Sequence, residues 1–267
     1  MKKAKSKPNA KIKTFLKGLL VGILCFSLIN SLVKDDPSKT KLRHKLQPEV
    51  VKIVDPMENG SGTGFYLEAT SGKYYVLTND HVCSLAGTGN QLVLIHNDGS
   101  RSVTKIIKRD TKSDLCLLDA PQEHGLELGN DVSKDEILYI YGYPLGIAQV
   151  LASGFALIDL TVTFESDLPK DKCFGGNLRW VTKEIRFFGQ VVGRIEVCEK
   201  SIASILTSTV IYPGNSGSPV LNESGDVIGI AFAAITATGF GFIIPVWEIK
   251  RFIQEVEDGQ KEIQKTK

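Results

Sequence analysis

Three polar side chains stand in settings from which they could act together on a carbonyl carbon. His81 follows the apolar run 75–77 in a polar turn, Asp114 opens the run 115–118, and Ser216 lies in a glycine-flanked turn between two apolar runs. A serine hydroxyl is a weak nucleophile until a base takes its proton, and a carboxylate can hold that base in the required tautomer. In the chain order His, Asp, Ser, these residue types supply the parts of an acyl-transfer site.

The turn around Ser216 offers a second chemical feature. A tight turn with this composition can aim the backbone N–H groups of Gly214 and Ser216 at one point, where a developing oxyanion would be stabilised. Each segment alone also has an ordinary interpretation: a plain hairpin loop for the Gly/Ser turn, a surface imidazole for His81, and a turn cap for Asp114. The combination of the three segments is what favours catalysis.

Four segments, in chain order, resemble motifs of the trypsin-like serine proteases of bacteria. They are residues 62–65 (Gly-Thr-Gly-Phe), 77–82 (Leu-Thr-Asn-Asp-His-Val), 113–115 (Ser-Asp-Leu) and 213–219 (Pro-Gly-Asn-Ser-Gly-Ser-Pro). The His and Asp segments are most similar to the high-temperature-requirement proteases, and the Ser segment is most similar to the glutamyl endopeptidases. The resemblance covers about residues 48–256.

This resemblance implies a role for each site residue. Ser216 would be the nucleophile, His81 the general base and then the general acid, and Asp114 the group that fixes the imidazole tautomer. The N–H groups of Gly214 and Ser216 would form the oxyanion hole. The implied substrate is a polypeptide, and the implied reaction needs no cofactor. If Asp114 does not orient His81, Asp110 is the nearest alternative carboxylate.

The sequence also departs from both branches of the family. Asn215 stands where animal digestive enzymes carry an Asp that pairs with a freshly cut N-terminus, so activation by such a cut is not implied. Ala231 occupies the position of the histidine that reads acidic side chains in glutamyl endopeptidases. Residues 161–200 are longer than either branch suggests, and we expect no peptide-binding module after the protease domain.

The resemblance places four residues at the substrate pocket: Val210, Ala231, Phe232 and Ala233. None of these carries a charge, and Ala233 stands where relatives with a deep pocket usually have Gly. Burying an unpaired charge there would cost several kcal/mol, whereas a small apolar side chain would gain about 0.8 kcal/mol per methylene. We therefore predict cleavage after small or medium apolar residues. In the alternative, Val210 and Ala233 are core and residues 161–200 build the pocket.

The rest of the chain predicts an all-β fold. Of the 267 residues, 42% are hydrophobic, and from Glu49 onward short β-branched and aromatic runs alternate with Gly and Asp-Gly turns. Such patterns favour barrels or sandwiches, and the resemblance implies two six-stranded antiparallel barrels with the site in their cleft. One closing helix is predicted at about 246–256, followed by a frayed charged end. This protease domain would span residues 48–267.

The N-terminus indicates a membrane segment. Residues 1–13 form a basic tail, and residues 14–33 are apolar apart from Lys17, which makes them a transmembrane signal anchor or a long signal peptide. No A-x-A pattern follows, so we favour a retained single-pass anchor. Positive-inside bias then places residues 1–13 in the cytoplasm, a polar linker at 34–47, and the protease domain outside the cytoplasm. Secretion after signal cleavage is the alternative.

Charge and cysteine usage limit the partners. Residues 1–45 hold eleven lysines and one arginine against two aspartates, a net charge of +10, which leaves −8 for the rest of the chain. An acidic folded part excludes nucleic acid as its expected partner. There is no C-x-x-C, H-E-x-x-H or acidic calcium loop, so no metal is expected. The oligomeric state stays open.

Four cysteines follow the membrane segment, and they permit three pairings. In an oxidising compartment, we predict a bridge between Cys173 and Cys198, which bracket the segment that the family explains least. Cys116 is expected to be a small buried strand residue, and the spacing of Cys83 does not match the disulfide of the animal enzymes.

Two other functions remain open besides a membrane-tethered serine endopeptidase. One is a catalytically inactive relative that binds peptides in the cleft. The other is a membrane-linked scaffold whose barrel is a spacer. Loss of active-site labelling on substitution of Ser216 would separate the enzyme from both.

Overall fold

The computed structural model describes residues 36–265 apart from 167, 174–176, 188 and 236–238. The chain divides into two units, residues 1–41 and residues 42–267, and the second contains every strand of the described part. The expected basic tail and the anchor at 14–33 lie outside the described residues. Within the described ranges, no helix has the length and apolar character needed to cross a membrane.

The first half of the domain is a closed barrel, as predicted. Among the described residues, six antiparallel strands follow one another around it in the order β1-β2-β3-β6-β5-β4. Their bounds are β1 Val50–Val54, β2 Ser61–Glu68, β3 Tyr74–Thr78, β4 Gln91–Ile95, β5 Arg101–Asp110 and β6 Leu115–Asp119. The barrel is filled by the inward residues of these strands, such as Ile53, Val76 and Leu94, which are inaccessible to solvent. Closure leaves no unpaired strand edge in this half.

The second half has one strand more than the six predicted. In the described part of the chain it is a seven-stranded sheet in the order β13-β12-β11-β7-β8-β10-β9, with an additional pairing of β13 with β10. The strands are β7 Ile137–Gly142, β8 Val150–Ser166, β9 Leu178–Phe187, β10 Gln190–Thr207, β11 Pro219–Leu221, β12 Val227–Ile235 and β13 Phe240–Pro245. The extra strand, β9, comes from the long segment 161–200.

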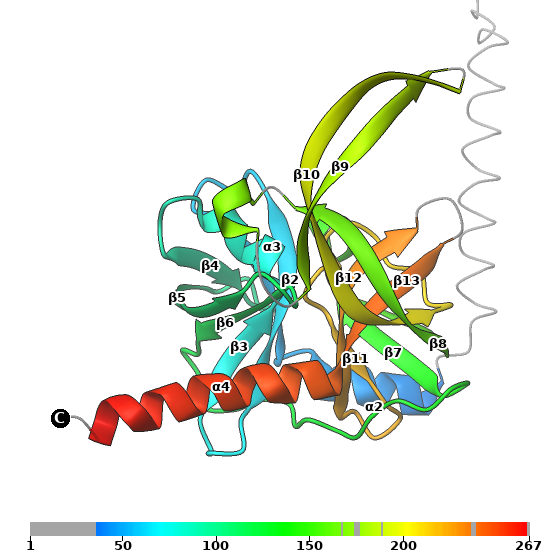
Figure 1. The fold of residues 1–267 in the computed structure, drawn as a ribbon. Helices are drawn as coiled ribbons and strands as arrows, with labels where there is room; N and C mark the ends of the chain where they lie inside the picture. The colour runs from blue at the N-terminus through cyan, green and yellow to red at the C-terminus, as the bar shows by residue number, and fades with distance from the viewer. Residues whose placement is uncertain (1–35, 167, 174–176, 188, 236–238, 266–267) are drawn as a thin grey trace, which may run out of the picture. The chain divides into compact units, whose positions relative to one another are not determined.

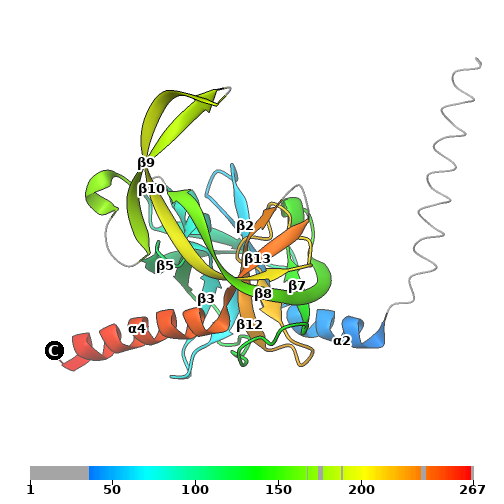
Figure 2. The same cartoon turned by 45° about the vertical axis from the view of Figure 1, so that its right-hand side comes forward.

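The length of β10 explains the extra strand. Its C-terminal part, from Cys198 to Thr207, pairs with β8, whereas its N-terminal part, from Gln190 to Lys200, pairs with β9. Figures 1 and 2 show β9 and the facing part of β10 as a two-stranded ribbon that extends beyond the rest of the sheet. A disulfide joins Cys173 to Cys198 at the base of this ribbon, which confirms the predicted bridge.

Helix α4, Val246–Lys265, is longer than predicted. Its buried residues include Ile249, Phe252 and Val256, which lie on the face that the sequence indicates. The helix continues beyond Val256 because the side chain of Glu257 is buried there and accepts hydrogen bonds from the hydroxyls of Thr70 and Ser71. The expectation of a frayed end from residue 257 is therefore wrong.

Residues 37–46 form helix α2, Pro37–Leu46, where the sequence indicates an irregular polar linker. Leu42 and Leu46, four residues apart and thus on one helix face, are buried in the core cluster that also contains residues of α4. Two leucines are too few to show a periodicity in the sequence, yet they suffice to dock a short helix. The remaining helical turns are α3 Asp80–Cys83, η1 Ser84–Ala86, η2 Pro144–Gly146 and η3 Lys170–Lys172.

Candidate active site

His81 and Asp114 are brought together by the pairing of β3 with β6. Thr78 at the end of β3 lies opposite Cys116 in β6, so α3, which begins two residues after Thr78, faces the residues just before β6. The backbone N–H of Asp80 and the side-chain amide of Asn79 both donate to the carbonyl oxygen of Asp114, at 3.1 Å. These two bonds hold Asp114 in a left-handed backbone conformation, with φ of 57°, which Asp tolerates better than most residues.

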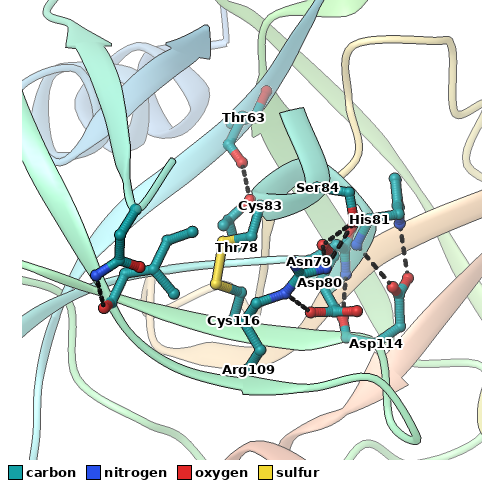
Figure 3. Close-up of a disulfide and its surroundings, with 12 residues drawn as sticks. Thr63, Thr78, Asn79, Asp80, His81, Cys83, Ser84, Arg109, Asp114 and Cys116 are labelled. Carbon is teal, nitrogen blue, oxygen red and sulfur yellow. Dashed lines mark hydrogen bonds and ion pairs between the residues drawn. A yellow bond between two sulfur atoms is a disulfide. The ribbon is translucent and has the colours of Figure 1, made fainter. Parts of the chain in front are cut away.

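The carboxylate of Asp114 binds His81 twice. Oδ2 lies 2.8 Å from Nδ1 of the imidazole, and Oδ1 accepts the backbone N–H of His81 at 3.1 Å (Figure 3). The Asp114 side chain is 4% exposed and that of His81 is 46% exposed, so the pair has a buried end and a solvent-facing end. An ionised carboxylate only accepts hydrogen bonds, which assigns the proton to Nδ1 and leaves Nε2 as the basic nitrogen.

The charge state of Asp114 follows from its contacts. Burial alone would raise the pKa of its carboxyl, but the hydrogen bonds and the charge of His81, together with the charge of Lys200, outweigh burial and lower the pKa below its ordinary value. Asp110, the alternative orienting group, points elsewhere. Its carboxylate accepts from Ser113 Oγ and pairs with Arg251 at 3.0 Å.

A disulfide between Cys83 and Cys116 braces the same region, and Figure 3 shows it beside the His81 and Asp114 pair. The expectation that Cys116 is only a small buried strand residue is therefore wrong, and Cys83 forms a bridge other than the one known from the animal enzymes. The bridge forms because α3 follows directly on β3, which places Cys83 above the β6 residue that pairs with Thr78. It covalently links the element of His81 to the strand that follows Asp114.

Ser216 lies on a turn that glycine makes possible. Gly214 and Gly217 have φ of 92° and 86°, and a Cβ at Gly217 would clash with the carbonyl oxygen of Thr63. The half-buried Ser216 side chain donates to the carbonyl oxygen of Phe232 at 3.5 Å. Within the described residues, no hydrogen bond joins Ser216 to His81.

The Thr63 side chain ties this turn to both halves of the domain. Its hydroxyl donates to the carbonyl oxygen of Gly214 at 2.7 Å and accepts from the backbone N–H of Tyr143 at 3.1 Å. Its backbone N–H donates to the carbonyl oxygen of Ser216 at 2.8 Å. With these carbonyl groups held, the N–H groups of Gly214 and Ser216 donate to no other described residue.

Comparison with known proteins now decides the family. The family model described as "Trypsin-like peptidase domain" matches residues 62–230. The chain belongs to this family of trypsin-like peptidases.

Individual relatives agree with this assignment. The serine protease Do-like HtrA of Bacillus subtilis is 28% identical over 213 residues, which are 74% of this chain and 40% of the relative. The protein of the same name from Lactococcus lactis subsp. lactis is 27% identical over 212 residues, which are 76% of this chain and 46% of the relative. The chain thus spans less than half the length of these relatives.

A solved structure supports the same fold. The serine endoprotease from Yersinia pestis superposes with a TM-score of 0.58 at 19% identity, covering 82% of this chain and 67% of that one. At this identity the likeness concerns the fold alone.

Two of the four predicted specificity residues of this trypsin-like peptidase, Ala231 and Phe232, contact the serine turn. Ala231 is fully buried and exchanges backbone hydrogen bonds with the serine turn, through Gly217 N–H and Ser218 carbonyl. Phe232 lies at an irregularity of β12, and its ring packs against Phe164 and Phe242.

The other two specificity residues are more accessible. Ala233 is partly buried, and Val210 is 40% exposed. Both outcomes for Val210, core or pocket wall, were left open by the sequence, and its exposure argues against a core position.

One residue of the site was missed. Lys200, in β10, places its ammonium nitrogen 3.5 Å from Oδ1 of Asp114. No motif marks it in the sequence, because it lies in the segment 161–200 for which the family offers no counterpart.

As for metals, the described residues contain no cluster of three or more His, Cys, Asp or Glu side chains able to hold an ion.

Proposed function

We propose that this trypsin-like peptidase is a serine endopeptidase whose catalytic triad is Ser216, His81 and Asp114. The observation that carries the proposal is the double contact between Asp114 and His81, at 2.8 Å and 3.1 Å. A carboxylate held in this way orients the imidazole and stabilises the imidazolium formed during reaction. The names of the relatives, which are serine proteases, point to the same activity.

The geometry suggests the following course. Substrate entering beside Ser216 would displace its weak bond to the Phe232 carbonyl, and the hydroxyl would rotate toward Nε2 of His81. Such bonds are often long in the free enzyme and shorten only with substrate bound. His81 then takes the hydroxyl proton as Oγ attacks the carbonyl carbon, and the N–H groups of Gly214 and Ser216 bind the oxyanion.

The second half of the reaction uses the same groups in reverse. Protonated His81 gives its proton to the leaving amine, which departs and leaves an acyl-enzyme on Ser216. A water molecule, deprotonated by His81, attacks this ester, and collapse of the second intermediate returns the proton to Ser216. Asp114 stays ionised throughout, in keeping with its lowered pKa.

The test is labelling of the purified chain with a fluorophosphonate, which reacts with activated serines. We expect the wild type to be labelled and to hydrolyse casein, and Ser216→Ala and His81→Ala to do neither. Ser224→Ala, at an exposed turn serine, is the matched control and should behave as the wild type. An unlabelled but folded wild type would instead favour the inactive peptide-binding protein.

We further propose that the enzyme cuts after small or medium apolar residues such as Val, Ala, Ile or Thr. The support is the uncharged character of Val210, Ala231, Phe232 and Ala233. The last three lie on β12, the strand that forms backbone hydrogen bonds with the serine turn through Ala231. A charged side chain bound there would lack a partner. Profiling with a peptide library tests this, and dominant cleavage after basic or acidic residues would contradict it.

Finally, we propose that residues 14–33 tether the enzyme to a membrane, with residues 1–13 in the cytoplasm and the protease domain on the other side. The support comes from the sequence: a basic tail followed by an apolar segment without a small-residue cleavage pattern. Polypeptides on that side of the membrane would be the substrates.

A further inference from the structure

We infer that Lys200 is a positioning residue that orients the Asp114 carboxylate from the second half of the domain. This inference rests on the proposed triad, because it assigns a role at the same site. It gives the long segment 161–200 a function in catalysis in addition to its place in the sheet.

Lys200 and the imidazole of His81 contact different oxygens of the Asp114 carboxylate. Its Nζ lies 3.5 Å from Oδ1 of Asp114 and 3.3 Å from the carbonyl oxygen of Thr111. Oδ1 is also the oxygen that accepts the backbone N–H of His81, whereas Oδ2 faces the imidazole. Lys200 therefore fixes the carboxylate without competing for the oxygen that the ring uses.

The burial of this contact makes it effective. The Lys200 side chain is 13% exposed and that of Asp114 is 4% exposed, so water screens the pair weakly. An ammonium group so placed both attracts the carboxylate and satisfies a lone pair that burial would otherwise leave without a donor.

The segment around Lys200 is attached firmly to the loop that carries Asp114. The side-chain amide of Asn177 donates to the carbonyl oxygen of Lys112 at 2.7 Å and to that of Ser201 at 2.5 Å. The Ser201 N–H donates back to the carbonyl oxygen of Asn177 at 2.9 Å. The disulfide at Cys198 lies two residues before Lys200. The lysine is thus held from both sides.

Several other charged groups around this loop are paired with one another. They come from α3, β5, β9, β10 and α4, and the pairs are Asp80 with Arg109, Asp110 with Arg251, and Glu199 with Arg179 and Lys183. The loop itself adds Lys112, for which the described residues show no ion pair. In the described part of the chain, the ion pairs of Asp114 are with His81 and Lys200. A change at Lys200 therefore acts on His81 through Asp114.

This arrangement predicts the sign of two effects. The positive charge of Lys200 offsets part of the negative field by which Asp114 favours the protonated imidazole. Without it, protonated His81 is favoured, and the acid limb of the kcat/KM profile moves to higher pH. The carboxylate also loses a partner that orients it, so kcat falls although the substrate surface is untouched.

The experiment compares full-length wild type with Lys200→Met, Lys200→Arg and Lys170→Met. For Lys200→Met we expect the acid limb to move up by roughly half to one pH unit and kcat to fall about tenfold, with KM nearly unchanged. Lys200→Arg keeps the cation and should restore most of the profile. Lys170 is an exposed lysine of the same segment that pairs with Glu196, and Lys170→Met should match the wild type.

A second readout needs no turnover. In the Ser216→Ala background, the low-field proton resonance of the His81 Nδ1–H reports its hydrogen bond to Asp114. We expect its titration to move to higher pH in Lys200→Met and to remain in place in Lys170→Met. If Lys200→Met does not fold, Lys200→Gln, which keeps a donor for the Thr111 carbonyl but no charge, carries the same expectation.

The outcomes separate this inference from the proposed function. A folded Lys200→Met or Lys200→Gln protein with the wild-type pH profile and wild-type resonance would overturn the role of Lys200. If Ser216→Ala at the same time loses hydrolysis, the proposed triad would still stand. Persistent hydrolysis in Ser216→Ala would overturn the proposed function itself.

Discussion

At the scale of single residues, the proposed chemistry depends on which atom of Asp114 faces the ring. An ionised Oδ2 at 2.8 Å from Nδ1 can only accept, so the carboxylate selects the tautomer with a basic Nε2. An asparagine has almost the same shape but can present an amide N–H at that point. The imidazole would then keep its proton on Nε2.

Asp114→Asn is therefore expected to lower kcat by about 10⁴-fold, the size of effect known for a tautomer error in such triads. Steady-state kinetics with a peptide substrate measures it, and circular dichroism should show an unchanged fold. Near-normal turnover in a folded variant would mean that another group orients His81.

Thr63 acts at the same scale, by joining the serine turn to the second half of the domain. Thr63→Val keeps the volume but leaves the carbonyl of Gly214 and the N–H of Tyr143 without their buried partner. We expect a loss of about 1–3 kcal/mol in the free energy of unfolding, measured with urea, and reduced turnover. Thr63→Ser, which keeps the hydroxyl, is the control. Equal stability and activity of the two variants would contradict this role.

At the scale of elements, the loop before β6 is held from outside by α4. Asp110 accepts from Ser113 and pairs with Arg251 of the helix. Burial opposes ionisation of Asp110, but these two partners outweigh it and lower the pKa of its carboxyl. A lowered pKa means that the stabilisation is present above the unfolded-state value and is lost as the pH falls through the folded-state value.

Asp110→Asn should thus destabilise the protein by roughly 1–2 kcal/mol at pH 5–7, and the difference from wild type should shrink below pH 3.8. Urea unfolding followed by tryptophan fluorescence at several pH values measures this difference. Asp159→Asn, at an exposed position in β8, is expected to change stability by less than about 0.5 kcal/mol. A difference that persists or grows in acid would show that the Asp110 pairs do not carry the effect.

At the scale of the whole molecule, the proposed tether determines where the enzyme works. We expect the full chain in the membrane fraction and resistant to carbonate extraction, because an apolar segment of this length resists removal by alkali. A variant without residues 2–33 should be soluble. Finding the mature wild-type chain soluble, with its first residue near 31–35, would replace the anchor by a signal peptide.

The sequence by itself determined the features that depend on local patterns. The turn around Ser216, the polar ends of the runs before His81 and at Asp114, and the apolar face of α4 all follow from neighbouring residues. The first barrel was predictable because its strands are short and regularly punctuated by turns. The bridge between Cys173 and Cys198 was predictable because these two cysteines bracket one segment.

Only the tertiary structure decided the features that join distant parts of the chain. Lys200 and Asp114 are 86 residues apart in the sequence, and Cys83 and Cys116 are 33 residues apart, so only the fold brings each pair together. Strand β9 and helix α2 form because neighbouring elements offer β9 a free strand edge and α2 a buried site for two leucines. Such contacts leave no periodicity in the sequence, since each is stabilised by a partner that only folding brings within reach.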